Sequence, residues 1–478
     1  MSAELTGDLT TRSSVALRDE FLRGAVRFTV DRLRTAKAKS IEALGSWDEW
    51  RDRGRAIRAH TIENLDYYLE QFCTNATARG AHVYFAADAS EARTKVVDLV
   101  QAASAKTVVK SKSMVSEEIH VNDRLAEAGI EVVETDLGEW IIQLAHETPS
   151  HIILPAIHKQ RAGIQVLFEK EGNEKLSPET KVLAGYARRR LREKFEKGDV
   201  GITGCNFAVA DTGSIVLFTN EGNGRMVTTL PPVHIVLMGM ERIVPTLDDL
   251  EVMANLLPRS ATGQKLTAYL NILTGPKPAE EADGAREVHV IIVDNGRSTQ
   301  LGDPHFQEVL HCIRCGACLN VCPVYRHIGG HAYGSVYPGP IGAVLTPLLQ
   351  PTARAGELAN ASTLCGACFE ACPVKIPLHD MLVHLRSRNV ERGHAPRLEK
   401  PALKIYAWVF SSPTLFRLVG WMIRWVQRIT SGTGKRGKWL LRWMGPFRGW
   451  TDYRALPPPA RDSFRALFKK TPKPGDQA

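Results

Sequence analysis

Seven of the nine cysteines lie in one short stretch of the chain, and their spacing is typical of metal ligands. The first group reads HCIRCGACLNVCPVY and contains Cys312, Cys315, Cys318 and Cys322, with two, two and three residues between them and a proline next. The second group reads STLCGACFEACPVKIP and contains Cys365, Cys368 and Cys372, again followed by proline. Because disulfides are rare in reducing compartments, so dense a cysteine block indicates metal binding.

The spacing favours iron-sulfur clusters over structural zinc. A tight loop wraps three thiolates around one face of an iron-sulfur cube, and the fourth cysteine, on the following helix, reaches the other cube. Zinc needs four ligands per site and has no use for a third cysteine at the same spacing or for the trailing Cys-Pro. Small residues such as Gly316 and Gly366 let backbone amides approach the sulfur atoms. The sequence therefore predicts a two-cluster, electron-transferring domain.

The crossover between the groups predicts two ligand sets. One cluster takes Cys312, Cys315, Cys318 and Cys372, and the other takes Cys322, Cys365 and Cys368. The second set has only three thiolates, because Ser362 stands three residues before Cys365. Two outcomes stay open: a [3Fe-4S] cluster, or a [4Fe-4S] cluster whose last iron is held by another oxygen or nitrogen ligand, by water or by a partner.

With 478 residues, the chain is long enough for about three domains. We expect N-terminal helices at 1–70, an α/β domain at 71–300, the cysteine domain at 303–390 and a basic, Trp-rich region at 391–478. The formal charge of +9 comes from that last region, where residues 401–478 hold 15 Lys and Arg against 3 Asp and Glu. The remainder is slightly acidic, which disfavours a nucleic-acid-binding protein.

The N-terminus has early acidic residues and no apolar segment of the secretory type. No run of about 18 consecutive apolar residues occurs, so no membrane span is predicted. We therefore expect a cytoplasmic protein.

Short β-branched runs alternate with amphipathic segments between residues 73 and 295. We expect strands at 82–86, 107–111, 130–135, 150–156, 214–219, 233–239 and 288–294, and helices at 90–105 and 117–129. Continuous apolar strands between helices predict a parallel or mixed sheet covered on both faces. Glycines and polar residues between Gly201 and Arg225 lie at strand ends, where open α/β sheets bind ligands. No GxGxxG unit and no Walker loop occurs, so NAD and ATP are not expected, whereas a flavin stays open.

The run GITGCNFAVADTGSIVL, followed by NEGNGRM, resembles the LUD (lactate-utilisation) domain. Together with the paired cysteine groups and the Trp-rich basic tail, it resembles the lactate-utilisation iron-sulfur protein B (LutB) family from about residue 70 to 470. The resemblance implies a LUD fold related to CoA transferases and ribose-5-phosphate isomerase. It also implies two [4Fe-4S] clusters with the ligand sets given above, the second with an unassigned fourth ligand.

The function that the resemblance implies is electron transfer in a multi-subunit system that oxidises L-lactate to pyruvate. The chain is then an electron-carrying subunit of an L-lactate dehydrogenase complex, alongside an A subunit with cysteine-rich CCG motifs and a C subunit with its own LUD domain. The sequence does not identify the electron acceptor. Two alternatives stay open: an iron-sulfur subunit for another 2-hydroxy acid such as glycolate, and a redox sensor whose LUD domain binds a ligand.

No catalytic residue is assigned from the sequence. Arg225 could hold a lactate carboxylate, with Glu221 or His234 as a base, although a loop-stabilising ion pair is the simpler role for it. Cys205 is expected to be a small buried apolar residue rather than a nucleophile.

Two further groups of polar residues have two interpretations each. The first follows a predicted strand and either holds an anion or forms a solvated loop: Lys110, Lys112 and Ser113. In the second group, His311 next to the first ligand tunes or ligates a cluster, and His327, His331 and Tyr333 line the clusters; the alternative for all four is that they are polar surface residues.

The C-terminal region holds six of the nine tryptophans: Trp408, Trp421, Trp425, Trp439, Trp443 and Trp450. Apolar residues at helical spacing predict one amphipathic helix over 405–429, with Arg417, Arg424 and Arg428 on its polar side. Trp and Arg are favoured interface anchors, so we expect this helix to contact a partner subunit. Peripheral contact with an anionic membrane surface is the second interpretation.

Overall fold

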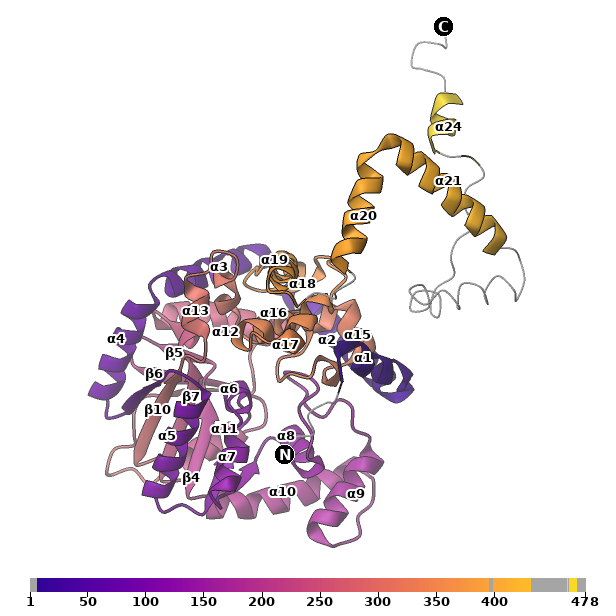
Figure 1. Cartoon of the computed structure of the whole chain (residues 1–478). Helices are drawn as coiled ribbons and strands as arrows, with labels where there is room; N and C mark the ends of the chain where they lie inside the picture. Colours follow the sequence, from indigo (N-terminus) through magenta and orange to yellow (C-terminus); the bar gives the residue numbers. More distant parts are fainter. Residues whose placement is uncertain (1–6, 395–398, 431–461, 463, 471–478) are drawn as a thin grey trace. The chain divides into compact units, whose positions relative to one another are not determined.

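The computed structural model describes residues 7–394, 399–430, 462 and 464–470 (Figure 1). The chain divides into two compact units, and the boundary between them lies between Arg392 and Gly393. The predicted tail residues Trp439, Trp443 and Trp450 lie outside the described residues.

A six-stranded, all-parallel sheet forms the centre of the first unit. Its strand order is β1-β10-β7-β4-β2-β3. The strands are β1 (His82–Ala86), β2 (Thr107–Lys110), β3 (Glu131–Glu134), β4 (Val200–Gly204), β7 (Val233–Gly239) and β10 (Glu287–Val293). The parallel sheet predicted from the apolar runs is confirmed, and its strands were anticipated except for β4.

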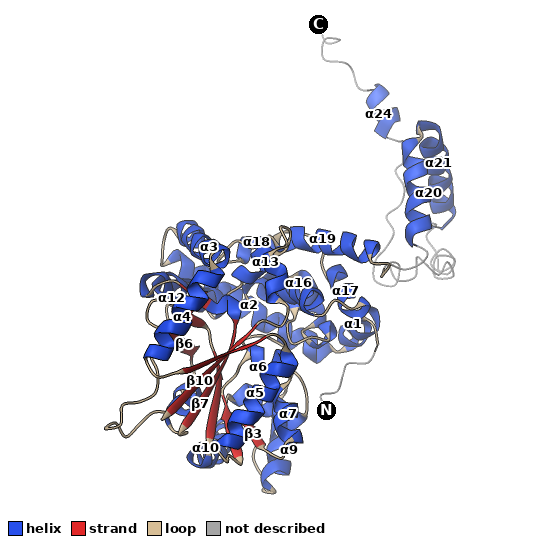
Figure 2. Cartoon of the chain, turned by 60° about the vertical axis from the view of Figure 1, so that its left-hand side comes forward, coloured by secondary structure: helices blue, strands red, loops and turns tan. Residues whose placement is uncertain are grey.

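Side chains along the central strands alternate between two apolar cores, as the period of a strand requires. In β10, Ile291 packs into a core with the first set of helices, whereas Val290 and Ile292 pack into the core on the opposite face. The first set comprises α5 (Ala89–Ala102), α6 (Met114–Glu118) and α7 (Val121–Glu127). A third core joins the β2-β3 edge to α8 (Leu137–Ala145), α9 (Arg161–Gly172) and α10 (Thr180–Lys197). Figure 2 shows the strands enclosed by helices.

A second, four-stranded sheet in the order β8-β5-β6-β9 contributes to the core on the opposite face. Its strands are β5 (Phe207–Val209), β6 (Ser214–Thr219), β8 (Ile243–Val244) and β9 (Tyr269–Leu273). The pairs β5-β6 and β6-β9 are antiparallel, and β5-β8 is parallel. Between β6 and β7 lies α11 (Asn223–Thr229), and after β8 come α12 (Leu247–Ala261) and then β9. Only β6 of this sheet was predicted.

The N-terminal helices and the cysteine region share this large core. The helices are α1 (Leu9–Arg18), α2 (Glu20–Glu42), α3 (Trp47–Glu63) and α4 (Leu65–Ala78). The α-helices of the cysteine region are α13 (Arg297–Leu301), α14 (Ala317–Val321), α15 (Pro323–Ile328), α16 (Gly339–Leu349), α17 (Ala353–Gly356), α18 (Ala367–Ala371) and α19 (Leu378–Glu391). Its short 3-10 helices are η2 (Gln307–His311), η3 (His331–Tyr333) and η4 (Glu357–Asn360).

Two predicted elements of the α/β region differ from the structure. The apolar segment 150–156 forms no strand; His151 Nδ1 accepts hydrogen bonds from the backbone N–H groups of Ile153 and Leu154, which holds a turn. This segment is buried against the cysteine region instead, where the Ser150 carbonyl accepts from the Tyr325 hydroxyl. The predicted helix 117–129 is divided into α6 and α7, because His120 between them has a left-handed backbone (φ 52°).

The described part of the second unit consists of α20 (Glu399–Ser411), α21 (Pro413–Thr430) and α24 (Phe464–Lys470). The single helix predicted over 405–429 is therefore wrong, because α21 starts anew at Pro413, whose ring is compatible only with the first turn of a helix. On α21 the side chains of Trp421 and Trp425 are exposed. Within the described ranges, no helix is both long enough and apolar enough to cross a bilayer.

Candidate metal centre and the cavity beside it

The two cysteine groups form a structural repeat. In each, the two residues that flank one cysteine, Cys315 or Cys365, have left-handed backbones: Arg314 and Gly316 (φ 59° and 74°) and Leu364 and Gly366 (φ 55° and 78°). Each loop leads into a five-residue helix, α14 or α18, and these helices pack against each other. Each helix ends at an extended cysteine that precedes a proline. The repeat brings both groups to one place.

All seven thiols are free of disulfides, and five of them are buried. Their electrostatic contacts divide them into two neighbouring groups. One group consists of Cys312, Cys315, Cys318 and Cys372, and the other of Cys322, Cys365 and Cys368. A contact between Cys318 and Cys368 joins the groups.

The buried thiols need positive charge before they can become thiolates. Burial, followed by the nearby Cys372, raises the pKa of Cys315 to about 12, and burial with Cys322 raises that of Cys368 to about 11. A metal ion supplies such charge and keeps its thiol ligands deprotonated. Soft thiolate groups of this kind fit iron-sulfur clusters.

Backbone N–H groups approach several sulfur atoms. Tyr325 N donates to Cys322 Sγ at 3.5 Å, and Ile376 N donates to Cys372 Sγ at 3.4 Å. In the first loop Arg314 N lies 3.4 Å from Cys312 Sγ. At the matching place of the second loop, Leu364 N donates to Ser362 Oγ at 3.1 Å. Ser362 therefore takes the place of Cys312 in the repeat.

Cations from the N-terminal helices hold the second cysteine helix from outside. Arg51 donates to the carbonyls of Cys372 and Phe369, both at 2.9 Å, and Lys37 Nζ donates to the Ala371 carbonyl at 2.6 Å. Burial lowers the pKa of Lys37, although the neighbouring Cys315 opposes this. These contacts were not predicted, because an arginine or lysine in a polar helix gives no signal of its distant partner.

A buried ion-pair network lies next to Cys312. Glu241 Oε2 accepts from Arg297 Nε at 2.7 Å, and its Oε1 lies 3.4 Å from Arg314 Nη2. Arg242 Nη1 donates to the Cys312 carbonyl at 3.2 Å. No pattern in the sequence singles out these residues.

A cavity of about 330 Å³ adjoins this network. It lies at the carboxyl ends of β2, β3 and β4, the usual ligand crevice of an open α/β sheet. Its polar lining includes Ser111, Lys112, Ser113, Asp136, Asn206, Glu221, Asn223, Arg242 and Arg314. Lys112 and Ser113 of the predicted anion-binding group thus reach a cavity, whereas Lys110 is fully buried between Glu117 and Glu134.

The structure does not bring together the three residues considered for binding lactate. Glu221 lines this cavity, but Arg225 is exposed outside it. His234 lines a different cavity, and its ring bonds to Thr203 Oγ1 at 2.8 Å. Cys205 borders the cavity, yet burial raises the pKa of its thiol to about 12, which fits an apolar role better than a nucleophilic one.

The residues expected near the clusters divide between two environments. Tyr333 is fully buried and interacts with Cys322, and His311 is buried. His327 is exposed and bonds to the Pro323 carbonyl.

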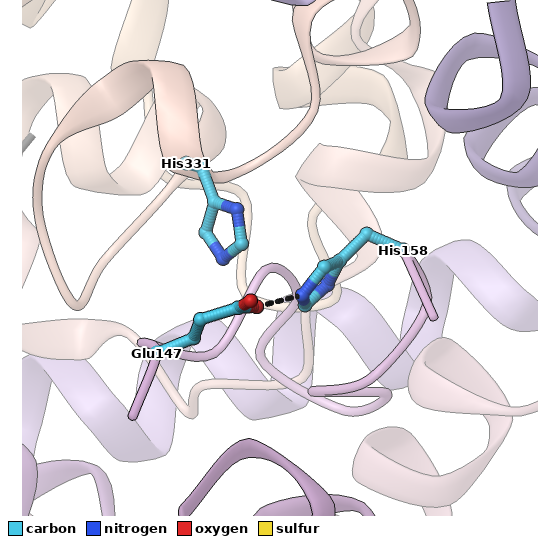
Figure 3. A group of neighbouring side chains, drawn as sticks. All are labelled: Glu147, His158 and His331. Carbon is cyan, nitrogen blue, oxygen red and sulfur yellow. Dashed lines mark hydrogen bonds and ion pairs between the residues drawn. The ribbon is translucent and has the colours of Figure 1, made fainter. Parts of the chain in front are cut away.

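His331 belongs to a separate cluster, in which it extends toward Glu147 and His158 (Figure 3). Glu147 accepts from His158 Nε2 at 2.6 Å and from Lys159 at 2.5 Å, and His331 Nε2 donates to the Thr148 carbonyl at 2.7 Å. Lys159 already balances the negative charge of the Glu147 carboxylate. We therefore interpret this cluster as a structural contact between the loop before α9 and the cysteine region.

Comparisons with known proteins cover almost the whole chain. Family models match for the LUD domain at residues 69–293, for a 4Fe-4S dicluster domain at 308–376, and for the C-terminal part of lactate utilisation protein B at 386–473. A lactate utilization protein B of Bacillus licheniformis is 50% identical over 460 residues, which cover 96% of this chain and 95% of that protein. One from Bacillus velezensis is 49% identical and covers 98% of both.

Among solved structures, a DUF162 family protein of Deinococcus radiodurans matches 48% of this chain and 98% of its own. The identity is 17% and the TM-score 0.28.

The buried Glu139, whose Oε1 lies 3.3 Å from Nζ of the cavity residue Lys112, predicts a pH dependence of stability. Burial, only partly opposed by Lys112, raises the pKa of Glu139 from 4.5 to about 8. The folded state therefore holds a proton that the unfolded state releases, so stability falls as pH rises from about 4.5 to about 8. In thermal melts, Glu139→Gln should reduce the loss of Tm between about pH 5 and pH 8 by at least about 2 °C. The exposed Glu251→Gln is the control; equal pH slopes in wild type and Glu139→Gln would contradict the prediction.

Proposed function

The chain belongs to the lactate utilization protein B family, and from this premise we propose that it is the electron-carrying iron-sulfur component of a multi-subunit system oxidising L-lactate to pyruvate. The observation that carries the proposal is the repeat of two cysteine loops, which gathers seven free thiols into two adjoining groups. Adjoining clusters supply one-electron transfer, and the chain acts as a subunit of an L-lactate dehydrogenase complex.

The proposed ligands follow the two groups. The first [4Fe-4S] cluster is held by Cys312, Cys315, Cys318 and Cys372, and the second by Cys322, Cys365 and Cys368. The crossover of the last cysteine in each group and the electrostatic neighbours of each thiol support this division.

In the proposed assignment, Ser362 is the fourth ligand of the second cluster. It stands where Cys312 stands in the other loop, and its Oγ accepts the matching backbone hydrogen bond. Arg386 Nη2 donates to the Ser362 carbonyl at 3.2 Å, which fixes the serine in place. A hydroxyl oxygen can replace a thiolate as ligand when the loop delivers it to the same position.

The proposed parts of the chain are the N-terminal helices at 1–70, the LUD domain at 71–300, the ferredoxin-type domain at 303–390 and the C-terminal region at 391–478. For the LUD domain we propose kinship with CoA transferases and ribose-5-phosphate isomerase, supported by its layered α/β architecture. The proposed partners are a CCG-motif A subunit and a LUD-containing C subunit, in the cytoplasm.

The first test is iron analysis and low-temperature EPR of anaerobically purified protein. We expect about eight irons per chain and two interacting signals after reduction, which also appear when L-lactate and the partner subunits are added. Cys315→Ala and Cys368→Ala should each remove one cluster, whereas the isolated Cys73→Ala should remove neither.

A single cluster per chain would contradict the ligand sets. Clusters that lactate never reduces, but whose state alters ligand affinity, would instead indicate a redox sensor.

Ser362→Ala should release the last iron of the second cluster and produce a [3Fe-4S] signal in oxidised protein, while Ser362→Cys should retain all irons. Asn360→Ala, at an exposed side chain two residues before the serine, is the control for local disturbance. An iron count in Ser362→Ala equal to that of wild type would assign the fourth position to water or to a partner.

We propose that the C-terminal region docks on a partner subunit; peripheral contact with an anionic membrane surface is the second candidate. On α21 the apolar side chains of Leu418, Trp421, Met422 and Trp425 are all exposed. Purified chain mixed with anionic liposomes should stay unbound in flotation, and Trp421→Ala with Trp425→Ala should abolish co-purification with the other subunits. Flotation of the chain by itself would favour the membrane instead.

A further inference from the structure

Two cations that line the 330 Å³ cavity have donor atoms without hydrogen-bond partners in the described part of the chain. They are Nε and Nη1 of Arg314 and Nζ of Lys112. Burying a charged donor without a partner is costly, and an anion in the cavity removes that cost. We propose that the cavity binds a small carboxylate, held by Arg314 and Lys112, beside Cys312.

Two contacts hold the Arg314 side chain in place and leave its Nε and Nη1 without hydrogen-bond partners in the described residues. Its guanidinium lies 4.6 Å from the centre of the Tyr337 ring, and its Nη2 lies 3.4 Å from Glu241 Oε1. The arginine side chain is only 8% exposed. A guanidinium fixed by stacking and one ion pair loses little conformational freedom on binding an anion.

Lys112 comes from the loop after β2, on the sheet side of the cavity. Its only ion pair in the described residues is with Glu139, at 3.3 Å. Because burial raises the pKa of that carboxyl to about 8, Glu139 binds a proton readily near neutral pH and leaves the ammonium charge for a ligand.

The remaining walls limit the size and chemistry of the ligand. Met114, Ile152 and Leu217 give an apolar surface, and Asp136 and Glu221 lie on the same cavity. Those two acids disfavour a second negative charge, so a short monocarboxylate suits the cavity better than a dianion. The choice of L-lactate and pyruvate as its natural ligands rests on the proposed function.

The cavity is coupled to the first cysteine group through Arg314, whose backbone N–H lies 3.4 Å from Cys312 Sγ. An anion here repels an electron added beside it. By linkage, the reduced protein should then bind the carboxylate more weakly than the oxidised protein does.

The test is calorimetric titration of the anaerobically purified, cluster-loaded chain with L-lactate, pyruvate, acetate and sulfate. We expect saturable binding of one carboxylate per chain, weaker binding of sulfate, and weaker binding after reduction. Lys112→Met and Arg314→Gln should each weaken carboxylate binding at least about tenfold, because each removes a charge-assisted hydrogen bond. Lys112→Arg should retain most of the affinity, and the exposed Lys181→Met, outside the cavity, should not change it.

Three outcomes would overturn the proposal in distinct ways. No carboxylate binding by protein with its full iron content removes the site but leaves the electron-carrying function. Equal binding of sulfate and lactate makes the ligand an adventitious anion. Unchanged binding in Arg314→Gln, with an altered EPR signal, makes this arginine a cluster-positioning residue only. Carboxylate binding by a chain that never takes up iron would instead overturn the proposed function and keep the site.

Discussion

The buried carboxylate of Glu241 is the point on which the assembly of the first unit depends. Burial opposes its ionisation, yet Arg297, Arg242 and Arg314 lower its pKa to about 2. Arg297 in turn binds Glu118 through two bonds of 2.8 Å. The network thus joins the second sheet, the helix after β2 and the first cysteine loop. Loss of one partner would leave buried charges unpaired, which typically costs about 3–5 kcal/mol.

The N-terminal helices are packed into the first unit next to the same network. Arg58 of α3 is almost fully buried and donates to the carbonyls of Glu241, Ile243 and Leu310. Burial lowers the pKa of this guanidinium to about 10, a cost that three carbonyl acceptors offset. One side chain therefore ties together the N-terminal helices, the second sheet and the segment that precedes Cys312.

Local signals predicted the local features and failed where partners are distant in sequence. The cysteine spacing and the apolar runs of β2, β7 and β10 are local, and the structure contains the expected strands. The apolar run 150–156 has the same composition as a strand, but its partner is the cysteine region, so periodicity alone could not separate the two. Pairs such as Arg51 with Cys372, more than 300 residues apart, leave no trace in a single sequence.

The two cysteine loops have the same backbone conformation but different surroundings, and the difference in surroundings affects function. The first group includes the buried Cys315 and Cys318 and adjoins the cavity through Arg314, whereas Cys365 of the second group is exposed. Electron transfer weakens steeply with distance, so a partner protein must approach the ligand that reaches the surface. A small ligand in the cavity meets the first group instead. The proposed relay therefore has different chemistry at its two ends, an enclosed polar cavity at one and an exposed docking point at the other.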